Sequence, residues 1–440
     1  MKILVTGLCT LHWGRLEFGN IGNFYIVQPL FRELHRVFPN AELITTFQMT
    51  DEFVARERIT VVPMEYYYSW NGSDVDSART EYELVKRCGE TIDEERLTPY
   101  IACVRECSLV INVSGDMWGD NAEHVGHGRF LVDLYKMAVA QLLHRKTVLF
   151  AGTPGPFSDQ STREFARRVY ESFSLVINRE PTSSMNLKKW NFISEHVKDF
   201  ACPAFLFEPE LEEGEIRAVD ELFQKLRSGD HRLLVGFTIG GFNMPVGPYD
   251  MWPREDSQYE VFAEAIEMLT ATQNARVVLI SHTNGFELPP NFKLINGRDY
   301  PILKQLESVI KKRGNIDSEK DIICLEGPYL PKITKAVIGR FDLFVTGRVH
   351  ASVAAVTQCV PTVFITYEKS FIPSSKMHGF SSLAGVGELV CEPGNKEEML
   401  EKIEYCCSNR SKIRKRLEHR IPEIQSMARS AFDEIRGLME

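Results

Sequence analysis

Short apolar runs rich in β-branched residues alternate along the chain with segments whose apolar residues recur every three or four positions. The first such run, Ile3–Thr6, precedes a segment in which Phe24, Val27 and Leu30 would share one face of a helix. Strands that alternate with amphipathic helices predict parallel sheets built from β-α-β units. Further predicted strands in the first half are Glu42–Phe47, Leu109–Val113, Thr147–Ala151 and Leu175–Asn178, and predicted helices include Phe130–His144 and Arg163–Glu171.

This alternation stops after Cys202-Pro203. The acidic stretch 208–215 and the helical pattern of residues 219–226 contain no predicted strand, so we place a domain junction here. A second series of predicted strands follows, at Leu233–Ile239, Val277–Ser281, Asp321–Leu325, Asp342–Thr346 and Thr362–Thr366. From Lys396 onward the pattern is helical and strand-free. The predicted domains are residues 1–205 and 231–392, with a linker at 206–230 and C-terminal helices at 393–440.

The predicted fold class is therefore α/β, with two Rossmann-like parallel-sheet domains facing a cleft. Open parallel sheets bind ligands beyond the carboxyl ends of their strands. We therefore expect the chemistry to be carried by loops that directly follow strands.

Composition narrows the class of protein. The 440 residues are 44% hydrophobic and 25% charged, with a net charge of −9, so the chain can bury a core and has no positive field for nucleic acid. The ten cysteines include no C-x-x-C pair, so the sequence does not indicate a zinc ribbon. Scattered cysteines of this kind are typical of proteins in a reducing compartment. The apolar runs are too short to span a membrane, and Met1–Gly7 is predicted to be a buried strand rather than a leader. We expect a cytoplasmic protein.

The C-terminal helical stretch carries a basic flank of Lys412, Arg414, Lys415, Arg416 and Arg420. A run of this kind is typical of a solvated helix face. The alternative is peripheral contact with an anionic lipid surface, at the inner face of the membrane, or with an anionic acceptor.

The strongest local pattern is the predicted strand Asp342–Thr346 followed by Gly347-Arg348-Val349-His350 and a run of small residues. Gly347 permits a tight turn, and Arg348 and His350 fall at the start of a predicted helix, where the helix dipole disfavours cations. Two basic side chains beside free backbone N–H groups suit a compact dianion such as a phosphate or a carboxylate. The alternative is structural, with Arg348 in a salt bridge and His350 in a satisfied turn.

Two further patterns follow strands of the first domain. Gly152-Thr153-Pro154-Gly155-Pro156-Phe157 forms a rigid loop that could bring the backbone at Gly155 close to a ligand, or could simply make a turn. Arg179 follows the strand Leu175–Asn178 and is a second candidate anion clamp, although an Arg-Glu pair at a strand end is often a surface ion pair.

Candidate sugar-binding residues lie in two other loops. Gly19-Asn20-Ile21-Gly22-Asn23 opens the first long helix but matches neither the dinucleotide-binding nor the P-loop pattern. In Ser114-Gly115-Asp116-Met117-Trp118-Gly119-Asp120, Trp118 offers a ring for stacking and Asp116 an acceptor for hydroxyls. Asp116, Asp120, His124 and His127 could alternatively bind a divalent metal, but their spacing is not diagnostic and we expect no metal site.

Taken in order, these segments resemble the polysaccharide pyruvyl transferase family. The resemblance rests on Gly19–Asn23, Ser114–Asp116, Gly155–Phe157, Arg179-Glu180 with Ser183 or Ser184, and Gly347–His350 with Pro361 and Tyr367. It implies a fold like that of GT-B glycosyltransferases and transfer of pyruvate from phosphoenolpyruvate to two sugar hydroxyls as a cyclic ketal, in exopolysaccharide biosynthesis. The partners that it implies are phosphoenolpyruvate as donor substrate and a glycan or carrier-linked sugar as acceptor, without a cofactor.

The resemblance also implies roles for individual residues. His350, Arg348 and Arg179 would be catalytic, and Gly347, Arg348, Arg179 and Gly155 would bind the donor. The residues predicted to bind the acceptor are Asn20, Asn23, Asp116, Trp118, His124 and His127. His350 is the side chain best suited to proton transfer near neutral pH.

Two other functions stay open from the sequence. One is a glycosyltransferase of the same architecture that uses a nucleotide sugar and places Arg348 on its diphosphate, although the chain lacks a clear Glu-x7-Glu signature. The other is a non-catalytic glycan-binding homologue, because Asn23 and Asp116 depart from the common family pattern.

Overall fold

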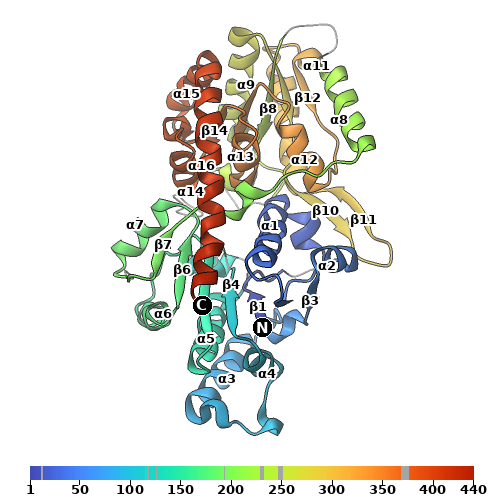
Figure 1. Cartoon of the computed structure of the whole chain (residues 1–440). Coiled ribbons are helices and arrows are strands. Elements are labelled where there is room, and N and C mark those ends of the chain that lie inside the picture. Colours follow the sequence, from blue (N-terminus) through green and yellow to red (C-terminus); the bar gives the residue numbers. More distant parts are fainter. Residues whose placement is uncertain are drawn as a thin grey trace. The chain divides into compact units, whose positions relative to one another are not determined.

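The computed structural model of the chain describes residues 1–10, 13–113, 115, 118–124, 126–192, 194–227, 232–245, 251–367 and 376–440, without the side chain of His124. The chain forms two compact units that are not contiguous in sequence (Figure 1). Unit 1 comprises Met1–Leu16, Val27–Pro203 and Ser426–Glu440, and unit 2 comprises Glu17–Ile26 and Ala204–Gln425. The predicted domains are each continuous in sequence. The structure instead groups residues 17–26 with the second sheet and residues 426–440 with the first.

Unit 1 is built on a seven-stranded parallel sheet of order β3-β2-β1-β4-β5-β6-β7. From the neighbours β1 and β4, the strand order continues toward opposite edges of the sheet, so the topological switch point lies between these two strands. The strand bounds are β1 Lys2–Thr6, β2 Glu42–Thr45, β3 Ile59–Val61, β4 Leu109–Asn112, β5 Lys146–Gly152, β6 Leu175–Asn178 and β7 Val197–Asp199.

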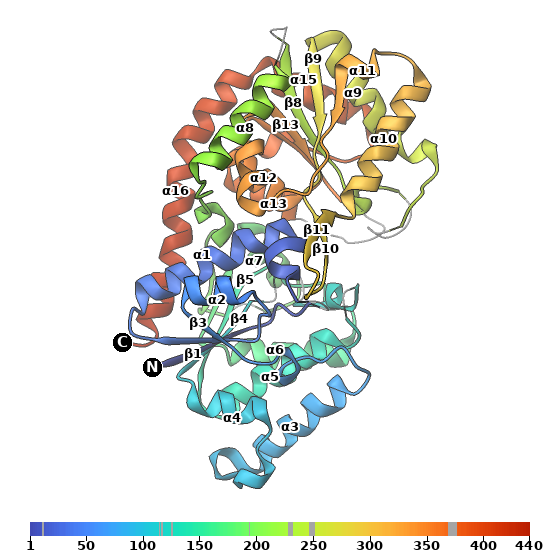
Figure 2. The same cartoon turned by 90° about the vertical axis from the view of Figure 1, so that its right-hand side faces the viewer.

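The core of unit 1 follows the period-2 pattern of its strands. Leu4, Val110, Leu149 and Val176 share one buried cluster with side chains from the helices on their face of the sheet. Figure 2 shows α3, α4 and α5 gathered near one another, and α3 packs directly on α5. The helix bounds are α2 Asp51–Glu57, α3 Asp74–Cys88, α4 Pro99–Glu106, α5 Arg129–Leu142, α6 Gln160–Glu171 and α7 Pro181–Lys189.

Unit 2 contains a six-stranded parallel sheet of order β12-β9-β8-β13-β14-β15. Its switch point lies between β8 and β13, which pair with Thr238 opposite Thr346. The strand bounds are β8 Leu233–Thr238, β9 Ala275–Leu279, β12 Ile322–Cys324, β13 Leu343–Thr346, β14 Thr362–Ile365 and β15 Val390–Cys391. A separate antiparallel hairpin joins β10, Asn284–Glu287, to β11, Lys293–Asn296.

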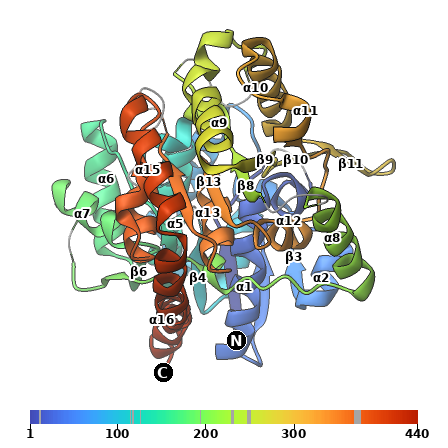
Figure 3. The ribbon, with the colours of Figure 1, turned by 90° about the horizontal axis from the view of Figure 1, so that it is seen from above.

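Helices cover both faces of the second sheet, as in a doubly wound fold (Figure 3). One layer holds α9, which packs on α10 and α15, and the other holds α12, which packs on α8 and α13. The bounds are α8 Glu213–Leu226, α9 Glu260–Gln273, α10 Asp299–Arg313, α11 Ser318–Asp321, α12 Pro331–Ile338, α13 Val349–Val356, α14 Lys376–Leu383 and α15 Lys396–Ser408.

Two helices pass from one unit to the other, α1 (Ile21–Val37) and α16 (Arg410–Gly437). The first turns of α1 join unit 2 through specific contacts. The Tyr25 hydroxyl donates to the Pro331 carbonyl at 3.1 Å, and the Tyr25 ring stacks on Phe207 with centroids 4.7 Å apart. Asn284 Nδ2 donates to the Phe18 carbonyl at 3.2 Å, and the backbone of Asn20 forms a bridge with that of Thr283. These contacts explain why residues 17–26 belong to the second unit.

The structure confirms the predicted fold class of two parallel sheets and every strand expected from the apolar runs. The short strands β3, β7 and β15 and the hairpin β10–β11 were not predicted, because runs of two to four residues carry little periodicity. All ten cysteines lie in the described residues and are free thiols. Within the described part of the chain, we find no helix with the length and apolar character needed to cross a bilayer.

Candidate active site at the carboxyl edge of the second sheet

Loops after β8 and β13 meet at the switch point of the second sheet. β13 ends at Thr346, and Arg348 is the N-cap of α13. Asn243 ties the two loops together, because its Oδ1 accepts from the Gly240 N–H at 2.9 Å and its Nδ2 donates to the Gly347 carbonyl at 3.3 Å. A Cβ on Gly347 would lie 2.2 Å from Asn243 Oδ1, so this close approach requires glycine. Arg348 and His350 are thereby held at the carboxyl edge of the sheet, as predicted.

Asp299 binds the guanidinium of Arg348. Arg348 Nε donates to Asp299 Oδ2 at 3.1 Å, and Nη2 donates to Oδ1, so the pair is bidentate. Asp299 is fully buried, whereas the Arg348 side chain keeps 15% of its surface exposed. Asp299 is the first residue of α10, where the helix dipole favours a carboxylate, and it offsets the cost of placing a cation at the start of α13. The salt bridge weighed above as the structural alternative for Arg348 is therefore present.

This pairing constrains any role of Arg348 in ligand binding. The Nε–Nη2 edge faces Asp299, so an incoming anion does not meet that edge. The carboxylate fixes the orientation of the guanidinium, which also packs on Gly240, where a Cβ would lie 2.8 Å from Arg348 Cζ. Arg348 is thus held in one orientation before any ligand arrives.

His350 lies against the glycine-rich turn that begins α1. A Cβ on Gly22 would be 2.7 Å from both Cβ and Nδ1 of His350, so the turn and the imidazole are in direct contact. Asn20 Nδ2 donates to Asn23 Oδ1 at 3.3 Å within the same turn. Asn20 and Asn23 were predicted to lie in the first domain. The structure places them in the unit that carries His350, because the turn packs on the second sheet.

A residue that the sequence analysis missed, His282, completes this cluster. It follows β9 and is 3% exposed, with its backbone N–H donating to Asp299 Oδ2 at 3.2 Å. Burial, reinforced by the charges of Arg348 and His350, lowers the pKa of His282 well below 6.5. Its imidazole is therefore neutral at physiological pH. The signal available in the sequence was its position, directly after the predicted strand Val277–Ser281.

Arg179, the other predicted clamp, lies in unit 1 after β6. It is buried, and its Nε donates to the Thr153 hydroxyl at 2.7 Å. One of its terminal nitrogens lies 3.9 Å from where a Cβ on Gly115 would be. The neighbouring Glu180 caps α7 by accepting from the Thr182 and Ser183 N–H groups at 2.7 and 3.2 Å. Burial raises the pKa of Glu180, while its bond to Ser183 and the charge of Arg179 oppose that shift.

Gly155 and Trp118 occupy structural positions in the same unit. The Gly155 N–H donates to the Trp118 carbonyl at 2.8 Å and the Gly155 carbonyl accepts from Asn121 Nδ2 at 3.2 Å, so its backbone serves the turn. Gly155 has φ +87°, which favours glycine. The expectation of an open stacking face on Trp118 is corrected, because the ring is fully buried and meets Phe130 and Phe173 edge to face.

Of the remaining predicted acceptor residues, Asp116, His124 and His127, the structure describes the side chain of His127. Asp116 lies outside the described residues, as does the side chain of His124. The His127 side chain is 89% exposed and lies 3.7 Å from Glu123. Across the described ranges, no group of three or more His, Cys, Asp or Glu is placed to hold a metal ion.

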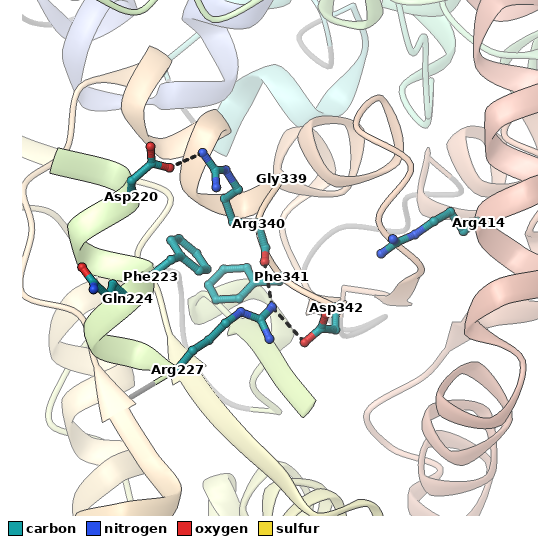
Figure 4. Close-up of a pocket in the computed structure, with 9 residues that line it drawn as sticks. All are labelled: Asp220, Phe223, Gln224, Arg227, Gly339, Arg340, Phe341, Asp342 and Arg414. Carbon is teal, nitrogen blue, oxygen red and sulfur yellow. Dashed lines mark hydrogen bonds and ion pairs between the residues drawn. The ribbon is translucent and has the colours of Figure 1, made fainter. Parts of the chain in front are cut away.

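A cavity of about 780 Å³ lies at the opposite, amino end of β13 (Figure 4). Two of the arginines that line it already bind carboxylates, with Arg340 on Asp220 at 2.5 Å and Arg227 on Asp342 at 3.0 Å. Arg414 of the basic flank also lines it. Elsewhere on that flank, Arg416 pairs with Glu388 and Arg420 pairs with Glu423. Because parallel sheets bind ligands at their carboxyl edge, we assign the functional site to the cluster around His350.

Solved structures show the same fold at low sequence identity. A glycosyltransferase from Rickettsia africae superposes with a TM-score of 0.62 at 10% identity, over 100% of this chain and 98% of that one. Anabaena Alr3699/HepE in complex with UDP and glucose gives 0.57 at 14% identity, over 100% and 99%. UDP-GlcNAc 2-epimerase from Neisseria meningitidis, bound to UDP-GlcNAc, gives 0.56 at 11% identity, over 100% of both chains. The fold is therefore GT-B-like.

Comparison with curated protein sequences finds no match. The sequence does match the family described as polysaccharide pyruvyl transferase, over residues 20–369. This range begins at Asn20 of the turn beside His350 and includes Asp299, Arg348 and His350 themselves. The chain therefore belongs to the polysaccharide pyruvyl transferase family.

Proposed function

We propose that the protein transfers pyruvate from phosphoenolpyruvate to two hydroxyls of a sugar, forming a cyclic ketal. The observation that supports this proposal most directly is the placement of Arg348 and His350 at one helix start, at the carboxyl edge of a parallel sheet. Phosphoenolpyruvate carries a phosphate and a carboxylate on three carbons, and a cation and an imidazole at a helix start suit such an anion.

The reaction needs a proton donor more than it needs a strong nucleophile. A proton added to the methylene carbon of phosphoenolpyruvate gives a methyl group and an oxocarbenium-like centre at the adjacent carbon. One sugar hydroxyl attacks that carbon and loses its proton. The carbon–oxygen bond to phosphate then breaks, and the second hydroxyl closes the ring with loss of its proton, so the products are the ketal and inorganic phosphate.

In this proposal His350 supplies the first proton. A histidine titrates near neutral pH and can therefore act as an acid in one step and a base in the next. Arg348, oriented by Asp299, stabilises negative charge on the phosphate as it leaves. Arg179 as an additional donor-binding cation, and Asn20 and Asn23 as acceptor contacts, remain predictions.

The proposal is tested by incubating the protein with phosphoenolpyruvate and a panel of glycan acceptors, and measuring phosphate release together with the mass gain of the sugar. We expect both signals at equal stoichiometry. Phosphate release without a modified sugar means hydrolysis and contradicts the transferase assignment. A parallel incubation with UDP-glucose tests the glycosyltransferase alternative, which predicts release of UDP and no reaction with phosphoenolpyruvate.

A further inference from the structure

His282 is held in place by its backbone rather than by its side chain. The His282 N–H donates to Asp299 Oδ2 at 3.2 Å, and the Asp299 N–H donates to the Thr283 hydroxyl at 3.2 Å. The preceding Ser281 hydroxyl donates to the Thr283 carbonyl at 2.8 Å and closes the turn. The ring itself meets Tyr25 edge to face, with centroids 5.6 Å apart. The position of the imidazole is thus fixed without using its Nε2 atom.

That Nε2 atom is buried and has no hydrogen-bond partner among the residues that the structure describes. Leaving a polar atom of this kind unmet costs about 1–3 kcal/mol, so buried polar groups normally have partners. Among the other atoms of this kind in the described residues, Thr238 Oγ1 lies at the end of β8 in the same sheet. Unmet polar atoms at the carboxyl edge of a parallel sheet are expected where a ligand supplies the missing partner.

The surroundings indicate what kind of ligand atom would meet His282. The His282 N–H and Arg348 Nε donate to the same oxygen, Asp299 Oδ2, so the guanidinium lies beside His282. An oxyanion that reaches His282 is therefore close to a cation. Asp299 is the carboxylate nearby, and it is engaged by Arg348 and by the His282 backbone. A neutral imidazole can donate a hydrogen bond through Nε2 to an oxyanion without adding a further charge.

We propose that His282 is a donor-binding residue whose Nε2 donates a hydrogen bond to an anionic oxygen of the bound donor. This inference rests on the proposed function for the identity of the donor, phosphoenolpyruvate. It adds a neutral contact to the charged one from Arg348. Asp299 is then a positioning residue, since it fixes both the Arg348 guanidinium and the backbone of His282.

Substitution of His282 tests the proposal. His282→Phe removes Nε2 while filling the same space, and His282→Gln returns an N–H donor close to the position of Nε2. We expect His282→Phe to weaken calorimetrically measured phosphoenolpyruvate binding about ten- to hundredfold, the range for a hydrogen bond to a charged group, and to raise KM more than it lowers kcat. His282→Gln should recover part of the affinity. Replacing the exposed His419 by Gln is the matched control and should change nothing.

A structural role for His282 predicts a different pattern. It predicts that His282→Phe lowers the unfolding temperature, whereas removal of an unmet polar atom should leave that temperature unchanged or raise it. Wild-type affinity in His282→Phe overturns the inference and leaves the proposed function standing. If the wild-type protein ignores phosphoenolpyruvate but binds UDP-glucose with an affinity that depends on His282, the proposed function fails and the oxyanion contact stands.

A measurement on the wild-type protein keeps the test independent of how the variants fold. In protein labelled with ¹⁵N-histidine, the His282 signal is assigned by its absence from the spectrum of His282→Gln. We expect the Nε2 resonance to move on addition of phosphoenolpyruvate, and inorganic phosphate and pyruvate as separate probes show which anionic group it meets. If none of these anions, nor UDP-glucose, moves the resonance, the inference is overturned.

Discussion

The carboxyl edges of the two sheets each carry an arginine predicted to bind the donor, but the two arginines are held differently. In unit 2, Arg348 forms a bidentate pair with the buried carboxylate of Asp299. In unit 1, the Nε of the buried Arg179 donates to a neutral hydroxyl, that of Thr153. A carboxylate fixes a guanidinium more firmly than a hydroxyl does, and it also cancels much of its charge. The Arg348 guanidinium is therefore fixed in its orientation by a charged partner, whereas the Nε of Arg179 is held by a neutral one.

The polar groups around each arginine also differ. Glu180, next to Arg179, caps α7, and the Gly155 backbone closes its turn. Both edges hold buried polar atoms without a partner among the described residues, which are Asn178 Oδ1 at the end of β6 and His282 Nε2 and Thr238 Oγ1 in unit 2. The atoms in unit 2 belong to an imidazole and a hydroxyl, which can donate to an anion, whereas Asn178 Oδ1 can only accept.

Breaking the carboxylate contact should have the largest effect on stability. Asp299→Ala leaves the Arg348 guanidinium and the His282 N–H without their acceptor, and loss of one partner of a buried pair costs about 3–5 kcal/mol. Urea unfolding measures this loss. A cost below about 1 kcal/mol, within the range of exposed pairs, would show that Asp299 does not hold the site.

Substituting the arginine itself should have the next largest effect. Arg348→Lys keeps the charge but cannot bind a carboxylate bidentately. We therefore expect kcat/KM for phosphoenolpyruvate to fall about ten- to 150-fold, which corresponds to about 1.5–3 kcal/mol of transition-state stabilisation. Arg179→Lys is the matched variant in unit 1 and should lose less, because its Nε contacts a neutral oxygen. Equal losses of kcat/KM in the two variants would contradict the claim that the two arginines are held differently.

His282 should make stability depend on pH. Its pKa is depressed in the folded state, so below about pH 6.5 the unfolded chain binds a proton that the folded chain does not. The free energy of unfolding should therefore fall with decreasing pH, by up to about 1.4 kcal/mol per pH unit from this group. In His282→Gln, the slope of the unfolding free energy against pH should be smaller than in the wild type by up to about 1.4 kcal/mol per pH unit, the contribution of one proton. An unchanged slope, measured by urea unfolding between pH 5 and 7, would contradict the depressed pKa.

The smallest effect is expected at the edge of unit 1. Thr153→Val removes the hydroxyl that accepts from Arg179 Nε and should cost about 1 kcal/mol, the typical value for a neutral hydrogen bond. Differential scanning calorimetry of Thr153→Val beside Asp299→Ala compares the two edges directly. A loss as large as that of Asp299→Ala would mean that Arg179 depends on Thr153 as Arg348 depends on its carboxylate.

Local sequence was sufficient to predict the sheets and the position of Arg348 and His350. Runs of β-branched residues define buried strands, and Gly347 followed by small residues defines a strand-to-helix turn. From the helix dipole we predicted a bound anion at the start of α13, with a salt bridge of Arg348 as the alternative, and the structure contains that salt bridge. The partner in that salt bridge was not predictable, because Asp299 is 49 residues away and meets Arg348 only through the order of the strands.

Other features depended on tertiary packing that local patterns do not encode. The turn at Gly22 joins the second unit because Tyr25 and Asn20 contact residues some 260 to 300 positions later. Trp118 lies in a loop rich in polar residues, a pattern typical of sugar contact, yet its ring fills an aromatic core contributed by α5 and the region after α6. His282 was visible as a residue after a strand, but its unmet nitrogen became visible only with its neighbours in place.

The most direct test of the central claim is the rate at which phosphoenolpyruvate and a sugar acceptor are converted to ketal and phosphate by the wild type and by His350→Ala. If His350 at the edge of the second sheet delivers the proton, the variant should lose about 10²–10⁴ in turnover while still binding phosphoenolpyruvate. Near-normal turnover by His350→Ala would contradict the account.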